Sequence, residues 1–452
     1  MNLKLTLLAG ACAALLANGA LVEAAVPAQQ AAALGTTLTP LGAEKGANAD
    51  GSIPEWKGGL TTAVPGKQLG DIPVDLFSDE KPKFSIKASN QAQYADKLSD
   101  GTRALLQKYP DSFRVDVYPT HRTAAAPDWV YKNTAQNALN CKLSGAPGVA
   151  MQGCYGGIPF PIPQNGLEVI WNFLLMTQPE SLEVGFKNLV LTSDGGRTLA
   201  SRNDETLQFP YYYHDGVAQK WTGEYYFGRF DTTAPSFKVG EALVIRDSVD
   251  SNVSRQAWQY LVGQRRVRRA PTVGYDTPDF VASGANYFDE VRGYFGYPDR
   301  YDWKLVGKQE MIIPYNTNGW HGVTVDQAFS AHHLNPDHLR WETHRVWVLE
   351  ATVAAGKRHA VPKRRFYIDE DSWAVVLMDG YDAEGKLWRT TQVPSFSVPK
   401  LPGNLVITAG IYNLQANTLS VAQDLHEEYF RVVPRKPDNH FTGDAVAADA
   451  TR

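Results

Sequence analysis

The chain has 452 residues, of which 43% are hydrophobic, and a formal net charge of -4. This length is enough to bury the core of one large β-rich domain. Acidic and basic residues are interspersed, so no basic field exists that would attract nucleic acid. The 11 Trp and 21 Tyr favour β-strands. After the first 25 residues, no apolar stretch is long enough for a transmembrane helix.

Residues 1–25 have the pattern of a secretory signal peptide, with Lys4, an apolar stretch and small residues ending at Ala24 and Ala25. The mature chain is therefore expected to begin near Val26 in an oxidising compartment, the periplasm. Cys12 follows a short Ala-Gly-Ala sequence that faintly resembles a lipoprotein cleavage site. Lipidation of Cys12 stays an open alternative, because cutting there would leave a very short apolar core.

Residues 26–140 are predicted to form an N-terminal arm, because Gly, Pro and Ala dominate its first half. Two short helices are expected at 91–98 and 102–109, and 111–139 reads as irregular, partly extended chain. The Asp50-Gly51 pair predicts a turn. It does not predict a calcium loop, since Gly46 and Lys57 stand where carboxylate ligands are needed.

Cys141 and Cys154 are the cysteines of the predicted mature chain, and a Gly/Pro-containing loop separates them. In a secreted protein, two cysteines so placed are expected to form one disulfide. This bond would fix the chain just before the most apolar stretch of the sequence. Two cysteines without an adjacent histidine do not suggest a metal site.

The stretch 156–176 predicts the only strongly apolar helix. Its prolines keep the first part extended, and Asn165 can cap a helix with Glu168 reaching back three residues later. Five residues share one helical face at i, i+3, i+4, i+7 and i+8: Leu167, Ile170, Trp171, Leu174 and Leu175. The other side is apolar too, so the helix is expected to be enclosed by protein or to rest on a lipidic ligand.

Short alternating strands with Gly/Asp turns follow this helix, and they predict an antiparallel sheet. Strands are expected at 182–191, 206–213, 223–230, 241–247, 255–262, 265–269, 303–315, 341–353, 363–368, 373–378, 387–393 and 405–412. Residues 286–294 predict a short helix or lid between strands. The predicted fold is β-rich (α+β), a large curved antiparallel sheet that forms a half-open barrel around the apolar helix. This body would span 141–435, and 436–452 would be a loose tail.

Several sequence blocks carry a family resemblance, among them GGIPFPIP at 156–163, GQRRVRRAP at 263–271, RYDWKLVGKQEM at 300–311, HRVWVLEAT at 344–352 and RFYIDEDSW at 365–373. In order and spacing they resemble domain-of-unknown-function family 1329 of Gram-negative envelope proteins. The C-terminal part also resembles the outer-membrane lipoprotein-sorting proteins, whose half-open barrel cups acyl chains. The resemblance implies a periplasmic carrier of hydrophobic cargo. It also implies work with an inner-membrane permease of the resistance-nodulation-division type and an outer-membrane barrel protein.

The usual catalytic patterns are incomplete. No Gly-x-Ser-x-Gly elbow is present, and the sequence beginning at His426 has Phe430 where a zinc protease needs its second histidine. His332, His333, His338 and His344, with Glu342, are interpreted as loop and strand residues and not as metal ligands. The carboxylates Asp369, Glu370 and Asp371 are interpreted as a charged hairpin turn. No cofactor, metal or catalytic residue is predicted.

Candidate ligand-binding residues are the apolar face of the predicted helix together with aromatic residues of the sheet: Leu167, Ile170, Trp171, Leu174, Leu175, Trp258, Tyr260 and Trp347. An ordinary core would use the same residue types. Four arginines form a basic strand, in which alternation places Arg265 and Arg269 on one face and Arg266 and Arg268 on the other. One pair could grip an anionic head group or a partner's acidic surface. A solvated edge strand protected by charge is the alternative.

The sequence therefore predicts a non-enzymatic periplasmic protein that binds or carries a lipid or another hydrophobic molecule. It would work with envelope export machinery and could sit peripherally at the outer membrane. An envelope assembly or interaction factor without a small ligand is the first alternative, and an envelope hydrolase is the second.

Overall fold

The computed structural model describes residues 26–74, 76–145, 148–270 and 273–450. The predicted signal peptide, with Cys12, lies outside the described residues. In the part described, no helix combines the length and the apolar character needed to cross a membrane.

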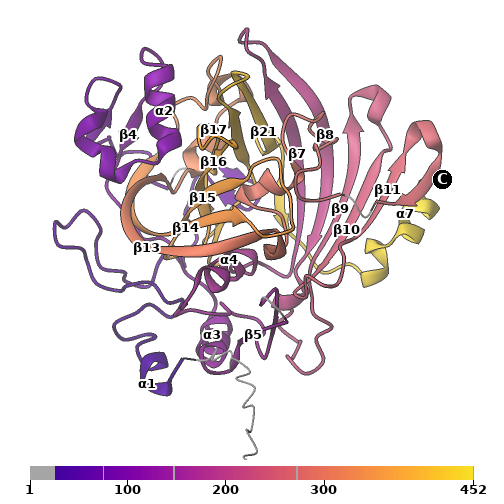
Figure 1. Cartoon of the computed structure of the whole chain (residues 1–452), viewed down its shortest axis with the longest axis horizontal. Helices are drawn as coiled ribbons and strands as arrows, with labels where there is room; N and C mark the ends of the chain where they lie inside the picture. Colours follow the sequence, from indigo (N-terminus) through magenta and orange to yellow (C-terminus); the bar gives the residue numbers. More distant parts are fainter. Residues whose placement is uncertain (1–25, 75, 146–147, 271–272, 451–452) are drawn as a thin grey trace, which may run out of the picture.

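One half of the main sheet is a run of sequential hairpins, seen on the right of Figure 1. Each strand pairs antiparallel with the next along the chain. The strands are β7 (Ser181–Leu191), β8 (Arg197–Gln208), β9 (Glu224–Ala234), β10 (Ala242–Ser248), β11 (Gln256–Leu261) and β12 (Arg266–Arg269). The expected strand at 206–213 begins earlier and ends at Gln208, because Pro210 starts a 3-10 turn there.

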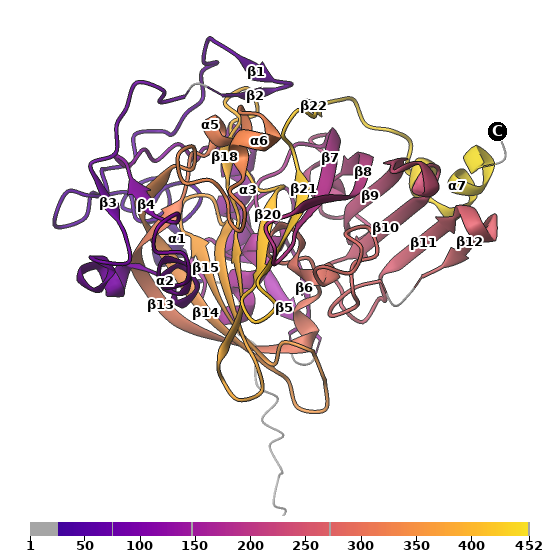
Figure 2. The same ribbon diagram turned by 90° about the horizontal axis from the view of Figure 1, so that it is seen from above.

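The other half curves strongly, and β13 sweeps round its outside in Figure 1. Its strands are β13 (Tyr301–Pro314), β14 (Trp341–Val353), β15 (Lys363–Asp369), β16 (Val375–Tyr381), β17 (Leu387–Gln392), β20 (Ala409–Asn413) and β21 (Thr418–Asp424). β21 pairs with β7 and joins the two halves into one sheet, as Figure 2 shows.

Short strands complete the sheet and the loops around it. β3 (Phe84–Ile86) pairs with β4 (Val115–Val117), which meets β14 in parallel, and β22 (Phe430–Val432) adds to β7. Three small hairpins are β1 (Gln68–Leu69) with β2 (Ile72–Pro73), β5 (Lys142–Ser144) with β6 (Ala150–Gln152), and β18 (Phe396–Ser397) with β19 (Asn404–Leu405). Within the described ranges β12 and β3 stand at opposite ends of the sheet order without pairing. The predicted half-open barrel is confirmed, with one parallel contact in an otherwise antiparallel sheet.

The helices are few and short. They are α1 (Ala28–Ala31), α2 (Asp100–Lys108), α3 (Asp128–Asn140), α4 (Gly166–Leu174), α5 (Asn318–His321), α6 (Val325–Ala328) and α7 (Gly443–Ala450). The 3-10 segments are η1 (Gln91–Lys97), η2 (Pro210–Tyr212), η3 (Ser236–Lys238), η4 (Val262–Gln264), η5 (Phe288–Gly293), η6 (Pro298–Arg300) and η7 (Asp438–Phe441).

The predicted apolar helix is α4, and it lies buried between the two halves of the sheet. The Asn165 side chain accepts a hydrogen bond from the Glu168 backbone, and a Glu168 oxygen accepts one from the Asn165 side chain. Gly166 is needed because a Cβ there would lie 2.6 Å from the Trp303 carbonyl oxygen of β13. On the other side Trp171 packs edge-on against Tyr225 of β9. The helix therefore closes one end of the half-barrel.

Two sequence predictions are wrong. Residues 111–139 are not irregular, because α3 occupies most of their second half. Its buried face includes the polar Thr134 and Asn137, whose side chains bond the backbone of the loop before α4. The described part of the tail, 436–450, is not loose either. Phe441 and Val446 are buried against the outer face of β9, β10 and β11.

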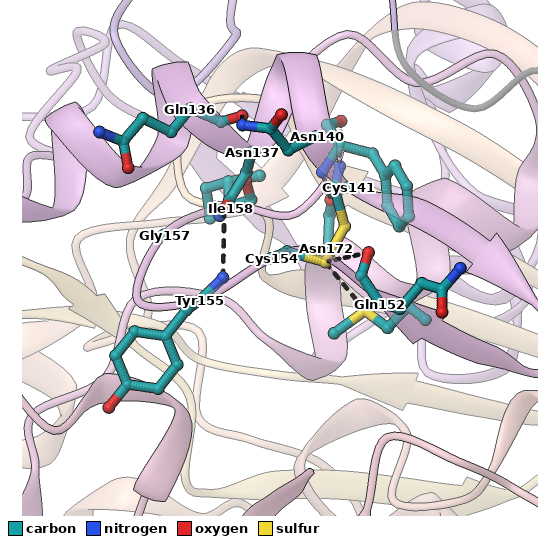
Figure 3. Close-up of a disulfide and its surroundings, with 12 residues drawn as sticks. Gln136, Asn137, Asn140, Cys141, Gln152, Cys154, Tyr155, Gly157, Ile158 and Asn172 are labelled. Carbon is teal, nitrogen blue, oxygen red and sulfur yellow. Dashed lines mark hydrogen bonds between the residues drawn. A yellow bond between two sulfur atoms is a disulfide. The ribbon is translucent and has the colours of Figure 1, made fainter. Parts of the chain in front are cut away.

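The structure contains the predicted disulfide between Cys141 and Cys154, with the Cα atoms 4.7 Å apart. It joins the end of α3 to the loop that leads into α4 (Figure 3). Next to it, the Asn137 side chain accepts from the Tyr155 N–H at 3.1 Å and donates to the Ile158 carbonyl at 3.3 Å. The bond and the amide together fix the approach to α4.

Asp379 of β16 helps to hold the N-terminal arm on the sheet through its contact with α2. One of its oxygens accepts hydrogen bonds from the Gly101 N–H of α2 and from the Thr390 hydroxyl of β17. Burial raises the pKa of Asp379 from 3.8 to about 6. Since the folded-state pKa is the higher one, stability is full below the unfolded pKa and is lost as the pH rises through the folded pKa.

We expect Asp379→Asn to be more stable than the wild type by about 2–3 kcal/mol at about pH 8, and by little at about pH 4. Asparagine keeps the accepting oxygen and never ionises. Urea unfolding at the two pH values measures the difference, and the exposed Asp302→Asn is the matched control. An equal gain at both pH values would contradict the role assigned to Asp379.

Candidate binding site

The half of the sheet formed by β7 to β12, which we call the flat half, carries a small apolar pocket on the face turned toward the interior. Strand alternation directs Phe186 of β7, Phe230 of β9, and Leu243 and Ile245 of β10 to this face. Val244, between the last two, points to the outer face and packs under the C-terminal tail. The register pairs Leu243 directly with Phe230, so their side chains lie next to each other.

The segment 279–295, which we call the inner segment, covers this pocket. It contains η5 and contributes the apolar side chains of Val281, Phe288, Val291 and Phe295 to the lining. η5 also packs against strands of the curved half, including β16 and β20. The sequence predicted a helix or lid here, and the structure places a 3-10 turn inside the half-barrel.

Three buried ion pairs hold the inner segment to three different strands. Two guanidinium nitrogens bond the carboxylates of Asp289 and Glu290, which is a strong geometry, whereas one nitrogen of Arg292 donates to both oxygens of Glu205. Asp289 accepts from Arg364 of β15 at 2.8 and 2.9 Å. Glu290 accepts through Oε2 from Arg389 of β17 at 2.7 Å. Arg292 donates to both oxygens of Glu205 of β8 at 2.9 Å.

The surroundings of these pairs shift two carboxyl pKa values in opposite directions. Burial raises the pKa of Glu205, and this outweighs the lowering effect of Arg292. Burial would also raise the pKa of Asp289, but Arg364 and His359 reverse the effect and hold that pKa well below its ordinary value. Asp289 is therefore a permanent anion in the interior, and breaking its pair would leave an uncompensated charge.

The pocket is small while the inner segment is in place. Its volume is about 30 Å³, enough for a water molecule but not for an acyl chain. Asp279 and Gln423 are the polar residues nearest the apolar lining, with Asn188. Burial raises the pKa of Asp279 to about 6. A larger ligand would require the inner segment to move off the sheet.

The structure places six of the eight predicted ligand-binding residues in the main core and separates the other two. Ile170, Trp171 and Leu175 are buried, while Leu167, Leu174 and Trp347 are half-buried against the same core. Trp258 and Tyr260 instead lie on the outer face of β11, under Phe441 and Val446. None of the eight lines the apolar pocket under the inner segment.

Trp347 stacks on Trp373 with a ring separation of 6.0 Å, and the Trp373 indole donates to the Leu41 carbonyl of the N-terminal arm. Its other ring neighbour is the Lys308 ammonium, 4.7 Å from the ring centroid. In this arrangement Trp347 helps to seat the arm on the sheet.

The four arginines lie at the free edge of the sheet. β12 starts at Arg266, and Arg265 belongs to the preceding turn with a left-handed φ of 49°. Leu243 of β10 pairs with Gln259 of β11, which in turn pairs with Arg268 of β12. Arg268 therefore shares the inner face with the apolar pocket. Arg266, two residues away, shares that face. Arg269 lies on the outer face with Trp258.

Sequence reasoning missed the partners of the inner segment. Glu205, Arg364 and Arg389 each stand within a β-strand and point into the interior, where an apolar residue is expected. A charged residue at an inward position of an otherwise apolar strand was the available signal. Alternation alone could not say which strands would share the interior.

The geometry defines a class of protein: a half-open β-barrel whose interior is filled by an ion-paired segment over an apolar pocket. A protein-family model described as a protein of unknown function (DUF1329) matches residues 85–447. The chain also resembles the uncharacterised protein PA3922 of Pseudomonas aeruginosa, with 41% identity over 374 residues, 82% of each chain. The chain therefore belongs to the DUF1329 family.

Two solved structures resemble the fold. One is a putative outer membrane lipoprotein-sorting protein domain from Vibrio parahaemolyticus, with 13% identity and a TM-score of 0.44, covering 62% of this chain and 98% of that one. The other is a DUF1329 family protein from Desulfovibrio piger, with 14% identity and a TM-score of 0.43, covering 62% and 97%.

The pair of Arg292 and Glu205 tests whether ion pairing holds the inner segment. Arg292→Met would leave Glu205 buried without its cation, and we expect it to lower the free energy of unfolding by about 3–5 kcal/mol. The double variant Arg292→Met with Glu205→Gln should recover more than half of that loss. Urea denaturation measures all variants.

Arg197→Met is the matched control, because Arg197 is one-third exposed and its partner Asp326 is 86% exposed. Its loss should stay below about 1 kcal/mol. If Arg292→Met costs no more than Arg197→Met, the ion pair does not hold the segment.

Proposed function

We propose that this protein is a periplasmic carrier that binds the apolar chain of an amphipathic molecule on the inner face of the half-barrel, beneath the inner segment. The observation that carries the proposal is the apolar pocket closed by a segment that three buried ion pairs attach to β8, β15 and β17. Apolar packing would resist release in water, whereas paired charges can be rehydrated when the segment moves out.

A basic end of the same face favours an amphipathic cargo over a purely apolar one. The row Phe230, Leu243, Gln259, Arg268 runs from the pocket to the sheet edge. Arg268 donates to the Gln259 side chain at 3.3 Å and is otherwise exposed, as is Arg266. A ligand with its chain under the inner segment would bring an anionic head group to these two arginines.

The location and partners belong to the same proposal. The signal-peptide pattern of residues 1–25 and the family resemblance support a periplasmic protein, with peripheral contact at the outer membrane. The partners we propose are an inner-membrane permease of the resistance-nodulation-division type and an outer-membrane barrel protein. The cargo would pass between them.

Recovery of cargo is the first test. The protein is purified from the periplasm without detergent and examined by native mass spectrometry, and its organic extract is analysed for lipids. We expect a defined hydrophobic molecule with the wild type. Phe230→Gln should lose it, because an amide replaces the apolar floor of the pocket.

Phe237→Gln is the matched control, since Phe237 lies at a hairpin tip and is 75% exposed. It should keep the cargo, and circular dichroism should show both variants folded. A clean ligand-free mass, with no uptake of added lipids, would contradict the carrier and favour an assembly factor that binds only proteins.

The two arginine pairs test whether the inner or the outer face of the sheet binds the head group. Binding of laurate and of the uncharged 1-dodecanol is measured by titration calorimetry. Arg266→Ala with Arg268→Ala should weaken laurate binding about tenfold and leave dodecanol binding unchanged, since one charge-assisted contact is worth roughly 1.5–3 kcal/mol. Arg265→Ala with Arg269→Ala should change neither. Equal effects of the two double variants would remove the head-group role.

A further inference from the structure

A buried group of carboxylates and one histidine lies away from the pocket, where β14 meets the turn between β15 and β16. His344 of β14, Asp369 at the end of β15 and Asp371 in the turn are each at most 3% exposed. One donor atom from each lies within 4.8 Å of the others. The sequence suggested a charged hairpin turn here, and the structure shows that the turn is buried under the N-terminal arm.

The distances in this group suit metal ligands better than hydrogen bonds. His344 Nδ1 lies 3.7 Å from an Asp369 oxygen and 4.0 Å from an Asp371 oxygen. Both separations are too long for a hydrogen bond. Two ligands that each lie about 2.1 Å from one ion are separated by roughly 3–4 Å, which is the spacing seen here.

The histidine is also oriented as a metal ligand. Its other nitrogen, Nε2, lies 3.0 Å from the Glu342 carboxylate. Glu342 is itself held by Arg340, by the Asn316 amide and by the His121 backbone N–H. A carboxylate that accepts from one ring nitrogen fixes the tautomer and leaves the lone pair of the other nitrogen free. Nδ1 is the ring nitrogen that faces Asp369 and Asp371.

Two polar atoms in the group have no hydrogen-bond partner, which a fully buried site does not ordinarily tolerate. They are Oδ1 of Asp369 and the hydroxyl of Tyr315, and both residues are 0% exposed. The other Asp369 oxygen accepts from the Ser372 N–H at 2.9 Å and from its hydroxyl at 2.6 Å. The Tyr315 ring lies against the His344 ring, with the centroids 3.9 Å apart and the planes tilted by 33°. The unpaired carboxylate oxygen is the one nearest His344 Nδ1.

The local charges leave room for a dication. Six carboxylates form one connected network: Glu44, Glu80, Glu342, Asp369, Glu370 and Asp371. The Lys and Arg side chains paired with them are Arg122, Arg340, Arg345 and Lys308. With neutral histidines the network carries two more negative charges than positive ones.

We propose that His344 Nδ1, Asp369 and Asp371 bind one divalent transition-metal ion of the Zn²⁺ type. A water molecule or the Tyr315 oxygen would complete four ligands. The mixed nitrogen and carboxylate donor set suits zinc. Because all three side chains are buried, the ion is structural, and it cross-links β14 to the turn after β15.

The ion also fastens the N-terminal arm. Asp371 receives two hydrogen bonds from Arg122, at 2.6 and 2.8 Å, and Arg122 donates to the carbonyls of Glu44, Lys45 and Pro54. Metal bound to Asp371 would fix the carboxylate that anchors Arg122. The site therefore supports the packing of the arm on the curved half.

The test uses the full mature protein, purified from the periplasm without a tag or chelator. Elemental analysis should find one zinc ion per chain. Unfolding in urea with a chelator should strip the ion, and refolding with Zn²⁺ should restore it and raise the melting temperature over refolding without metal. Asp369→Asn should bind less than a tenth as much zinc, whereas the exposed control Asp302→Asn should bind as much as the wild type.

Anomalous diffraction at the zinc edge decides the matter even if Asp369→Asn does not fold. A peak between His344, Asp369 and Asp371 in wild-type crystals grown with Zn²⁺ supports the proposal. A peak only at other residues, no peak, or unchanged zinc binding by Asp369→Asn overturns it, and the group then holds protons in place of a metal.

Discussion

The structure depends on filling the inside of a sheet that does not close. The curved half and the flat half meet along β21 and β7, and between them lies an interior that water would enter if nothing filled it. The inner segment fills it and is fixed by three ion pairs to β8, β15 and β17. Removing two charges from water costs several kcal/mol, so these pairs add little to net stability compared with apolar side chains of the same size. What they add is position, because each guanidinium donates to its carboxylate in a defined geometry.

The two segments that fill the interior, α4 and the inner segment, are held by different interactions. α4 is held by apolar packing and by its cap, with Ile170 and Trp171 at 0% exposure, so it behaves as permanent core. The inner segment also has apolar contacts away from the pocket, since Tyr294 packs edge-on against Trp303 and Phe366. Three ion pairs fix it to the strands in addition. A polar substitution in α4 would therefore destroy the fold, whereas one in the pocket floor tests binding. The distinction decides which variants can report on cargo.

Much of the fold could be predicted from the sequence, because strand alternation, turn residues and the capping residues of α4 are local signals. The helix α3 could not, since Thr134 and Asn137 on its buried face bond a loop and leave no apolar period. The outward direction of Trp258 and Tyr260 could not be predicted either, because strand alternation defines two faces of a sheet but does not show which of them is the inner face. The partners of Asp289, Glu290 and Arg292 lie 75, 99 and 87 residues away, and only the folded sheet brings them together. His344 and Asp369 were recognised separately for the same reason.

One strand connects the two buried charge networks. β15 carries Arg364, which binds Asp289 of the inner segment, and five residues later Asp369, which faces His344. Phe366 and Ile368 between them are fully buried, so the strand cannot shift at one end without straining the other. The arm is fastened through Asp371 and Arg122, and the inner segment is fastened through Arg364. Both are thus attached to the same rigid strand or to the turn that follows it. A cation between His344 and Asp369 would stiffen the strand to which the inner segment is paired, without contacting the segment itself.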